Sequence, residues 1–285
     1  MANDMLKFVK MHGCGNDYVF FDCFDQQISE PETLSRKISD RNKGVGGDGI
    51  ILICPPSDST VADAKMLMFN ADGTAAAMCG NAIRCVGKYL YESGRAAKST
   101  LKVETLVGVK ILELIILDGV VNSVRVNMGR AELKPGEIPV DLVGDSIIGR
   151  EVKIAGYKYE ITCVSMGNPN VVIFNDDIDH FEMEKIGPTI ECAKIFPERA
   201  NFEVAQIISR NNIRMRVWNR GAGETMACGT GACSAAVAAV LMGYCDKDTD
   251  ITVQVRGGVL TVKYTDDAVY MTGGCEKVFE GEMAI

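Results

Sequence analysis

Two cysteines, Cys79 and Cys228, lie where a sequence pattern predicts the start of an apolar helix. Each is followed by a glycine, a small polar residue and a run rich in helix formers. The first turn of a helix offers unpaired N–H groups and about half a positive charge, which favours a thiolate and can also hold a carboxylate. The residues next to the two thiols are Gly80, Asn81, Gly229 and Thr230.

Two thiols that face each other across a small pocket can form a disulfide, bind a metal or move protons. A metal site usually needs three or four ligands, and His12 and His180 are the only histidines of the chain. The 11 cysteines include no Cys-x-x-Cys pair. A redox role for the two thiols is therefore not excluded, but no motif favours it. Of the three uses, proton transfer fits the residues that flank the two cysteines best. One thiolate would remove an α-proton, a thiol on the opposite face would return one, and both helix starts would stabilise the carbanion, with no cofactor and no metal.

The flanking patterns predict the elements that position these cysteines. In each half of the chain, strands precede one apolar helix and more strands follow it. A hairpin is predicted at Asp118-Gly119, and a helical stretch with an irregular end is predicted at Asp179–Phe196. We predict an α/β (α+β) fold of two pseudo-symmetric domains, each a sheet or barrel-like layer around a central helix, with the active site in the cleft between them. The predicted domains are residues 1–128, joined by a returning tail at 275–285, and residues 129–274.

Composition sets the remaining expectations. The chain has 285 residues, 47% of them hydrophobic, and a formal net charge of −8, so it lacks the basic footprint of a nucleic-acid-binding protein. The N-terminal residues show no apolar signal-peptide core, and the longest apolar run is short for a membrane span. We therefore expect a cytoplasmic protein with neither nucleic-acid nor membrane partners, in which most cysteines are reduced and buried.

Five motifs, taken together, resemble the diaminopimelate epimerase family over essentially the whole chain. The resemblance implies a fold of two pseudo-symmetric α/β domains and a homodimer. It also implies interconversion of LL- and meso-diaminopimelate without pyridoxal phosphate or metal, a step in the synthesis of lysine and of cell-wall precursors. The motifs are Met11-His-Gly-Cys-Gly-Asn-Asp17, Phe69-Asn-Ala-Asp-Gly73, Met78-Cys-Gly-Asn-Ala-Ile-Arg-Cys85, Ser165-Met-Gly-Asn-Pro169 and Arg220-Gly-Ala-Gly-Glu-Thr-Met-Ala-Cys-Gly-Thr-Gly-Ala-Cys233.

The resemblance also implies roles for individual residues. Cys79 and Cys228 would be the acid–base pair, and the N–H groups of Gly80-Asn81 and Gly229-Thr230 would hold the reacting α-carboxylate. Arg220 suits the distal carboxylate of the substrate, because its planar fork matches a carboxylate in two hydrogen bonds. The substrate-binding residues would be Asn16, Asn70, Gly80, Asn81, Asn168, Asn201, Asn219, Arg220, Gly229 and Thr230.

Three positions depart from the family pattern. Asn170 and Asn42 stand where the family usually has histidine, and Asn219 stands where it has glutamate. An amide can hydrogen-bond but cannot exchange a proton or carry charge at neutral pH. The alternatives are a related cofactor-independent racemase of another amino acid, an inactive amino-acid-binding homologue and a thiol redox protein. Arg220 favours diaminopimelate, because a smaller amino acid would leave a buried guanidinium unpaired.

Overall fold

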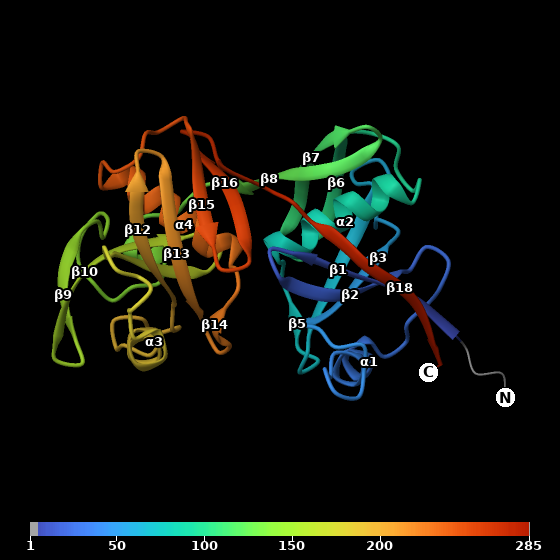
Figure 1. Ribbon diagram of the computed structural model, residues 1–285, viewed down its shortest axis with the longest axis horizontal. Helices are drawn as coiled ribbons and strands as arrows, with labels where there is room; N and C mark the ends of the chain where they lie inside the picture. The colour runs from blue at the N-terminus through green and yellow to red at the C-terminus, as the bar shows by residue number, and fades with distance from the viewer. Residues whose placement is uncertain (1–4, 285) are drawn as a thin grey trace. The chain divides into compact units, whose positions relative to one another are not determined.

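The computed structural model describes residues 5–284 and divides the chain into two compact units (Figure 1). Unit 1 comprises Met1–Val126 together with Gly273–Ile285, and unit 2 comprises Asn127–Thr272. Within the described residues, the structure contains no helix with the length and apolar character that crossing a membrane requires.

Unit 1 begins with a hairpin whose strands are joined by Cys14 and Gly15, both in the left-handed backbone region at φ 54° and 78°. The second strand pairs in parallel with the third, and two antiparallel pairings then lead to a short strand before the helix. These elements are β1 (Met5–Gly13), β2 (Asn16–Asp22), α1 (Pro31–Ile38), β3 (Gly49–Cys54), β4 (Ala64–Asn70), β5 (Ala75–Ala76) and α2 (Gly80–Glu92).

After α2 the chain rejoins the sheet. Strand β6 (Thr100–Thr105) pairs in parallel with β4, and β7 (Gly108–Leu117) and β8 (Val120–Gly129) follow as antiparallel neighbours. The predicted hairpin turn is confirmed, because Asp118 and Gly119 both have positive φ, as a two-residue turn requires. The C-terminal strand β18 (Glu276–Ala284) returns to pair antiparallel with β1 (Figure 1).

Unit 2 repeats the same succession of pairings, which confirms the predicted pseudo-symmetric repeat. The pairings β1–β2, β2–β3, β3–β4, β4–β5 and β4–β6 of unit 1 are antiparallel, parallel, antiparallel, antiparallel and parallel. The same order of directions recurs in unit 2 for β10–β11, β11–β12, β12–β13, β13–β14 and β13–β15. The elements are β9 (Arg150–Ile154), β10 (Tyr157–Ser165), β11 (Pro169–Phe174), α3 (Met183–Glu191), β12 (Asn201–Ser209), β13 (Asn212–Asn219), β14 (Gly223–Thr225), α4 (Gly229–Leu241), β15 (Asp250–Val255), β16 (Gly258–Tyr264) and β17 (Val269–Gly273), with a 3₁₀ turn at Pro135–Glu137.

The central helix of unit 2 is buried on nearly every side. Residues Gly231–Ala239 of α4 are all buried, and the helix packs against β10, β11, β12, β13, β15 and β16. Its small apolar side chains explain this position, because a helix with apolar residues on every face must be buried by other elements on every face. The sheet of unit 2 therefore holds α4 in place along its length.

The predicted helix Asp179–Phe196 is too long. Helix α3 spans only Met183–Glu191. The carbonyl groups of Ile178 and Phe181 accept hydrogen bonds from Arg216 at 2.6 and 2.9 Å, so they are engaged outside a helix. The short strands β5 and β14 were not predicted, because two or three residues carry too little pattern to identify.

Candidate active site

Cys79 lies at the start of α2, as the sequence pattern predicts. It is the N-cap residue, with extended backbone at φ −129° and ψ 121°, and its carbonyl accepts the first helical hydrogen bond from Ile83 at 3.0 Å. The thiol therefore lies beside the free N–H groups of the first turn, including those of Asn81 and Ala82.

The side chain of Asn16 contacts the Cys79 thiol. The sulfur donates to Asn16 Oδ1 at 3.2 Å, and Asn81 Nδ2 donates to the same oxygen at 3.3 Å. Asn16 Nδ2 donates to Asp48 Oδ2 at 2.6 Å. The structure thus brings together three residues that the motifs identified. Asp48 was missed by sequence reasoning; it lies in the glycine-rich segment Gly44–Gly49 that leads into β3.

Burial raises the pKa of the Cys79 thiol, and four groups oppose that effect. They are the N–H groups of Ala82 and Asn81, the Tyr18 hydroxyl and the Arg84 guanidinium. Tyr18 was not predicted as part of the site; burial holds its own pKa well above the usual value, and the charge of Cys79 adds to this. Tyr18 therefore stays a hydrogen-bond donor over the range in which a thiol titrates.

Arg84 lies fully buried one turn into α2. Its Nη1 donates to the carbonyl of Gly80 at 3.0 Å, and its Nε donates to the carbonyl of Gly274 at 3.4 Å. Long side chains on a helix lean back toward its N-terminus, which here brings a permanent positive charge beneath the first turn. This charge adds to the positive end of the helix dipole.

Cys228 occupies the equivalent place in unit 2. It is the N-cap of α4, with φ −134° and ψ 119°, and its sulfur accepts the N–H of Gly231 at 3.4 Å. Thr230 Oγ1 lies 3.3 Å from the sulfur, and Asn201 Nδ2 lies 4.0 Å from it. Thr230 and Asn201, both predicted site residues, therefore surround this thiol.

A buried amide network extends from Asn201. Its Oδ1 accepts the backbone N–H of Arg220 at 2.8 Å, and its Nδ2 donates to Asn170 Oδ1 at 3.1 Å. Asn170 Nδ2 in turn donates to the carbonyl of Asn168 at 2.7 Å. Asn170 therefore links the predicted site residues Asn168 and Asn201, at a position where the resemblance predicts histidine.

Two further predicted residues end equivalent strands. Asn70 ends β4 and donates to Thr74 at 3.0 Å, whereas Asn219 ends β13 and donates to Thr225 at 2.6 Å. The guanidinium of Arg220, which we expected to be buried, is exposed in the structure and donates to the carbonyl of Glu198 at 2.8 Å. In the described part of the chain, these three side chains lie outside the hydrogen-bond clusters around the two thiols.

Glu203 lies beneath the first turn of α4 and was missed by sequence reasoning. It is fully buried, and within residues 5–284 neither carboxyl oxygen has a hydrogen-bond partner. A Cβ added at Gly231 would lie 2.6 Å from Oε1, so the helix approaches this carboxyl closely. Burial holds the pKa of Glu203 well above its usual value, which favours the uncharged acid. Alternation along β12 places it on the same face as Asn201.

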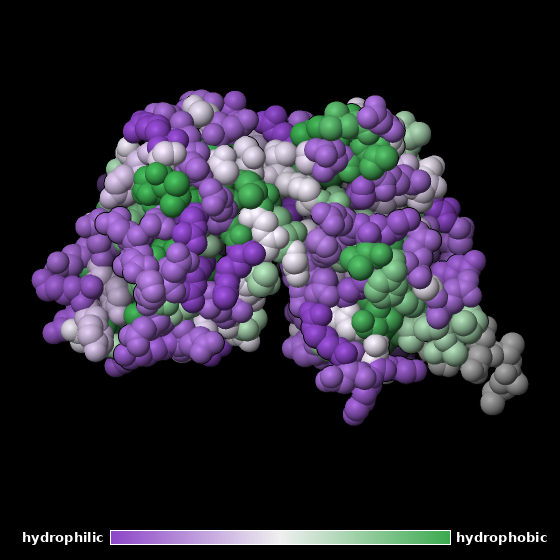
Figure 2. Space-filling model, in the orientation of Figure 1, coloured by the Kyte–Doolittle hydropathy of each residue, from purple (hydrophilic) through white to green (hydrophobic). Residues whose placement is uncertain are grey.

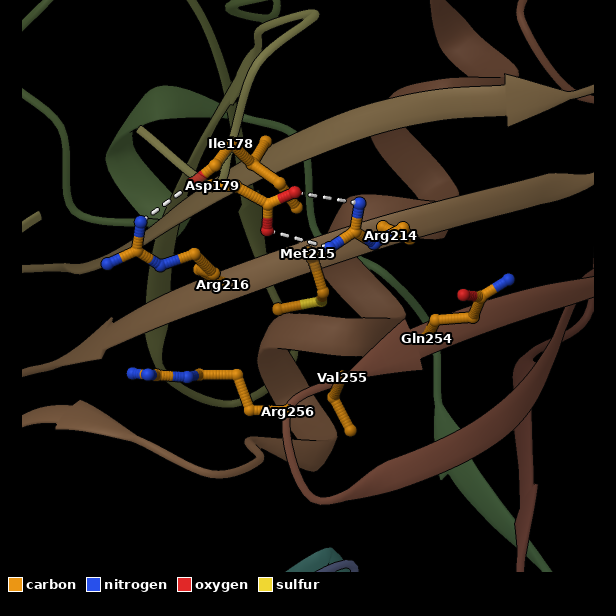
Figure 3. Close-up of a pocket in the computed structure, with 8 residues that line it drawn as sticks. All are labelled: Ile178, Asp179, Arg214, Met215, Arg216, Gln254, Val255 and Arg256. Atoms are coloured by element: carbon orange, nitrogen blue, oxygen red, sulfur yellow. Dashed lines mark hydrogen bonds and ion pairs between the residues drawn. The ribbon is translucent and has the colours of Figure 1, made fainter. Parts of the chain in front are cut away.

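An arginine-lined cavity of about 230 Å³ lies elsewhere on unit 2 and contains neither cysteine (Figure 3). Its arginines are already engaged with acids. Arg214 forms two hydrogen bonds to Asp179, at 3.2 and 2.8 Å, and Arg216 forms two to Glu224, at 2.7 and 3.0 Å. We interpret the cavity as structural. Its lining residues are Ile178, Asp179, Arg214, Met215, Arg216, Gln254, Val255 and Arg256.

Glu224 should stabilise the segment that leads to Cys228. Its carboxylate also lies 3.0 Å from Arg256, and only 11% of its side chain is exposed. We expect Glu224→Gln to lower the free energy of unfolding by about 2 kcal/mol, because it removes the carboxylate partner of Arg216, whose side chain is only 15% exposed. Urea denaturation would measure this. The matched change Asp179→Asn, at a pair whose carboxylate is 63% exposed, should cost below about 1 kcal/mol, and equal losses would contradict the prediction.

Comparison with known proteins gives the family. The sequence model of the family described as diaminopimelate epimerase matches residues 8–134 and 162–278. A diaminopimelate epimerase of Methanococcus maripaludis is 49% identical over 98% of this chain and 100% of its own length. A diaminopimelate epimerase of Acetivibrio thermocellus is 48% identical over 98% of each chain.

A solved structure supports the fold. The crystal structure of a hydroxyproline epimerase from Agrobacterium vitis superposes with a TM-score of 0.71 over 99% of this chain and 93% of the other, at 15% identity. The equivalent helix-capping cysteines, the repeated topology and the full-length sequence matches agree: the chain belongs to the diaminopimelate epimerase family, a family of isomerases.

Proposed function

We propose that this protein interconverts LL- and meso-2,6-diaminopimelate, with Cys79 and Cys228 as the acid–base pair. The observation that carries the proposal is the repeated placement of the two thiols in a chain of this family. Each cysteine caps a 13-residue helix at the equivalent point of its unit, beside first-turn N–H groups that have no partner within the helix.

In this proposal one sulfur, as thiolate, takes the α-proton and leaves the electron pair on the carbon. The other sulfur, as thiol, delivers its proton to the opposite face, so the carbon inverts and the two sulfurs exchange protonation states. No electrons are transferred, and no cofactor takes part. The N–H groups of Gly80-Asn81 and Gly229-Thr230 would hold the α-carboxylate, toward which the carbanion charge spreads.

Other residues would bind the rest of the substrate. The Arg220 guanidinium suits the distal carboxylate, with Asn70, Asn168 and Asn219 as hydrogen-bonding groups. Asn81 Oδ1 is a buried acceptor without a partner among the described residues, and it suits a substrate ammonium group. We place the reaction in the cytoplasm, where reducing conditions keep both cysteines in the thiol or thiolate form and prevent a disulfide.

Proton NMR of LL-diaminopimelate in D₂O tests this function, with purified protein and no added cofactor. The expected result is loss of an α-proton signal together with growth of the meso isomer, because the returned proton comes from solvent. A protein that binds diaminopimelate without exchanging its α-proton would contradict the proposal and favour the binding homologue. Exchange with another amino acid alone would favour a different racemase.

We also propose that the protein is a homodimer. The exposed outer face of β7 carries four apolar side chains around Glu113, and Figure 2 shows a hydrophobic area over this part of unit 1. Exposed apolar patches of this kind are typical of interfaces. Sedimentation velocity should give about twice the 30.8 kDa chain mass, whereas a monomer at all concentrations would contradict the proposal. The exposed side chains are Val109, Ile111, Ile115 and Leu117.

A further inference from the structure

The amide of Asn16 can take only one orientation beside Cys79. Its other edge faces the carboxylate of Asp48, at 2.6 Å, and a carboxylate only accepts hydrogen bonds. The edge toward Asp48 must therefore be the NH₂ group. This turns Oδ1 toward the Cys79 sulfur, 3.2 Å away, where it accepts a hydrogen bond from the thiol. An acceptor of this kind stabilises the protonated form of its partner.

The amide of Asn201 is fixed in the opposite sense beside Cys228. Its Oδ1 faces the backbone N–H of Arg220, which only donates, so its NH₂ group faces the thiol. That NH₂ lies 3.1 Å from Asn170 Oδ1 and 4.0 Å from the Cys228 sulfur. Asn170 is oriented in turn by the carbonyl of Asn168. A donor stabilises the thiolate, as does the N–H of Gly231.

We propose that these two fixed amides set the resting protonation states of the pair, so that Asn16 holds Cys79 as the thiol and Asn201 favours Cys228 as the thiolate. The inference rests on the proposed epimerase function and gives both asparagines a positioning role in addition to substrate binding. The isomer whose α-proton faces Cys228 then reacts with the resting enzyme. The other isomer reacts after the two sulfurs have exchanged states.

The charged and titratable groups around each thiol are compatible with this assignment. Burial raises the pKa of the Cys79 thiol and outweighs the groups that favour its thiolate, which are the N–H groups of Ala82 and Asn81, the Tyr18 hydroxyl and the Arg84 guanidinium. Asp48, held by Arg41 at 3.0 Å, places a negative charge behind Asn16. Glu203 lies beneath α4, and burial favours its uncharged form, so it does not oppose a thiolate at Cys228.

The same substitution at the two asparagines tests the proposal. Alkylation by iodoacetamide is followed from pH 6 to 10, and each cysteine is read from its own peptide by mass spectrometry, which needs no turnover. In the wild-type protein we expect Cys228 to show the lower apparent pKa. Asn16→Ala should lower the apparent pKa of Cys79, and Asn201→Ala should raise that of Cys228, each by about one unit. Asn42→Ala, in an exposed turn, is the matched control and should shift neither.

Shifts in the same direction, or no shift, would overturn the proposal. So would a lower apparent pKa at Cys79 than at Cys228 in the wild-type protein, a result that does not depend on whether a variant folds. A different experiment tests the proposed function: absence of α-proton exchange in the NMR measurement would reject it. The two apparent pKa values could shift in opposite directions in a protein that does not exchange the α-proton. That outcome would support the assigned protonation states of Cys79 and Cys228 and reject the epimerase function.

Discussion

Cys79→Ser and Cys228→Ser should each lower the rate of diaminopimelate epimerisation by about a thousandfold or more. A serine hydroxyl is far less acidic than a thiol, so it can neither take the α-proton as an anion nor return one readily. The fold should persist, because serine is a good N-cap residue and both cysteines occupy N-cap positions. Proton NMR in D₂O measures the rate, and thermal unfolding checks the fold.

Cys192→Ser is the matched control. Cys192 is exposed at the end of α3 and is not one of the two cysteines at a helix N-cap, so its loss should leave the rate unchanged. If Cys79→Ser epimerised diaminopimelate at the wild-type rate, the two-thiol mechanism would be wrong. A melting temperature far below that of the wild-type protein in either variant would show instead that the cysteine is needed for folding.

The sequence predicts the two helix starts because their cause is local. A glycine and a small polar residue after each cysteine let the backbone turn, and the apolar run that follows can be stable only inside a sheet. The repeat of this arrangement in each half predicts two similar units, and the topology of the sheets confirms it. The turn at Asp118-Gly119 is local in the same way.

The groups that surround the thiols were not predictable in this way. Tyr18, Asp48 and Glu203 reach their positions through the register of strands that are distant in sequence, and none of them stands in a motif that identifies its role. The predicted helix at Asp179–Phe196 was too long for a related reason. Arg216, more than 30 residues later, engages the carbonyl groups of Ile178 and Phe181.

Two of the three departures from the family pattern have structural roles that the sequence does not reveal. Asn170 is buried and orients Asn201, whereas Asn219 bonds to Thr225 just before the Cys228 segment. Each amide supplies a fixed dipole where an ionisable group would supply a charge that depends on pH. The state of Cys228 in this protein should therefore depend on hydrogen-bond direction more than on neighbouring titrations.

Glu203→Gln should stabilise the protein above about pH 4.5, increasingly as the pH rises. The pKa of Glu203 is raised by burial in the folded state, whereas the unfolded chain has the ordinary value of about 4.3. Below that value both states hold the proton, so glutamate and glutamine should be equivalent. Above it the unfolded state releases its proton and the folded state does not, so the wild-type protein loses about 1.4 kcal/mol of stability per pH unit, up to the folded pKa.

Urea denaturation from pH 4 to 9 would measure the difference between Glu203→Gln and the wild-type protein. Glu160→Gln, an exposed change in the same unit, is the control and should show a difference close to zero at every pH. If Glu203→Gln were the less stable protein at pH 8, the carboxyl would have to be ionised and stabilised in the fold. A negative charge would then lie beneath the first turn of α4 and would oppose a thiolate at Cys228, so the same experiment constrains the assignment of the resting thiolate.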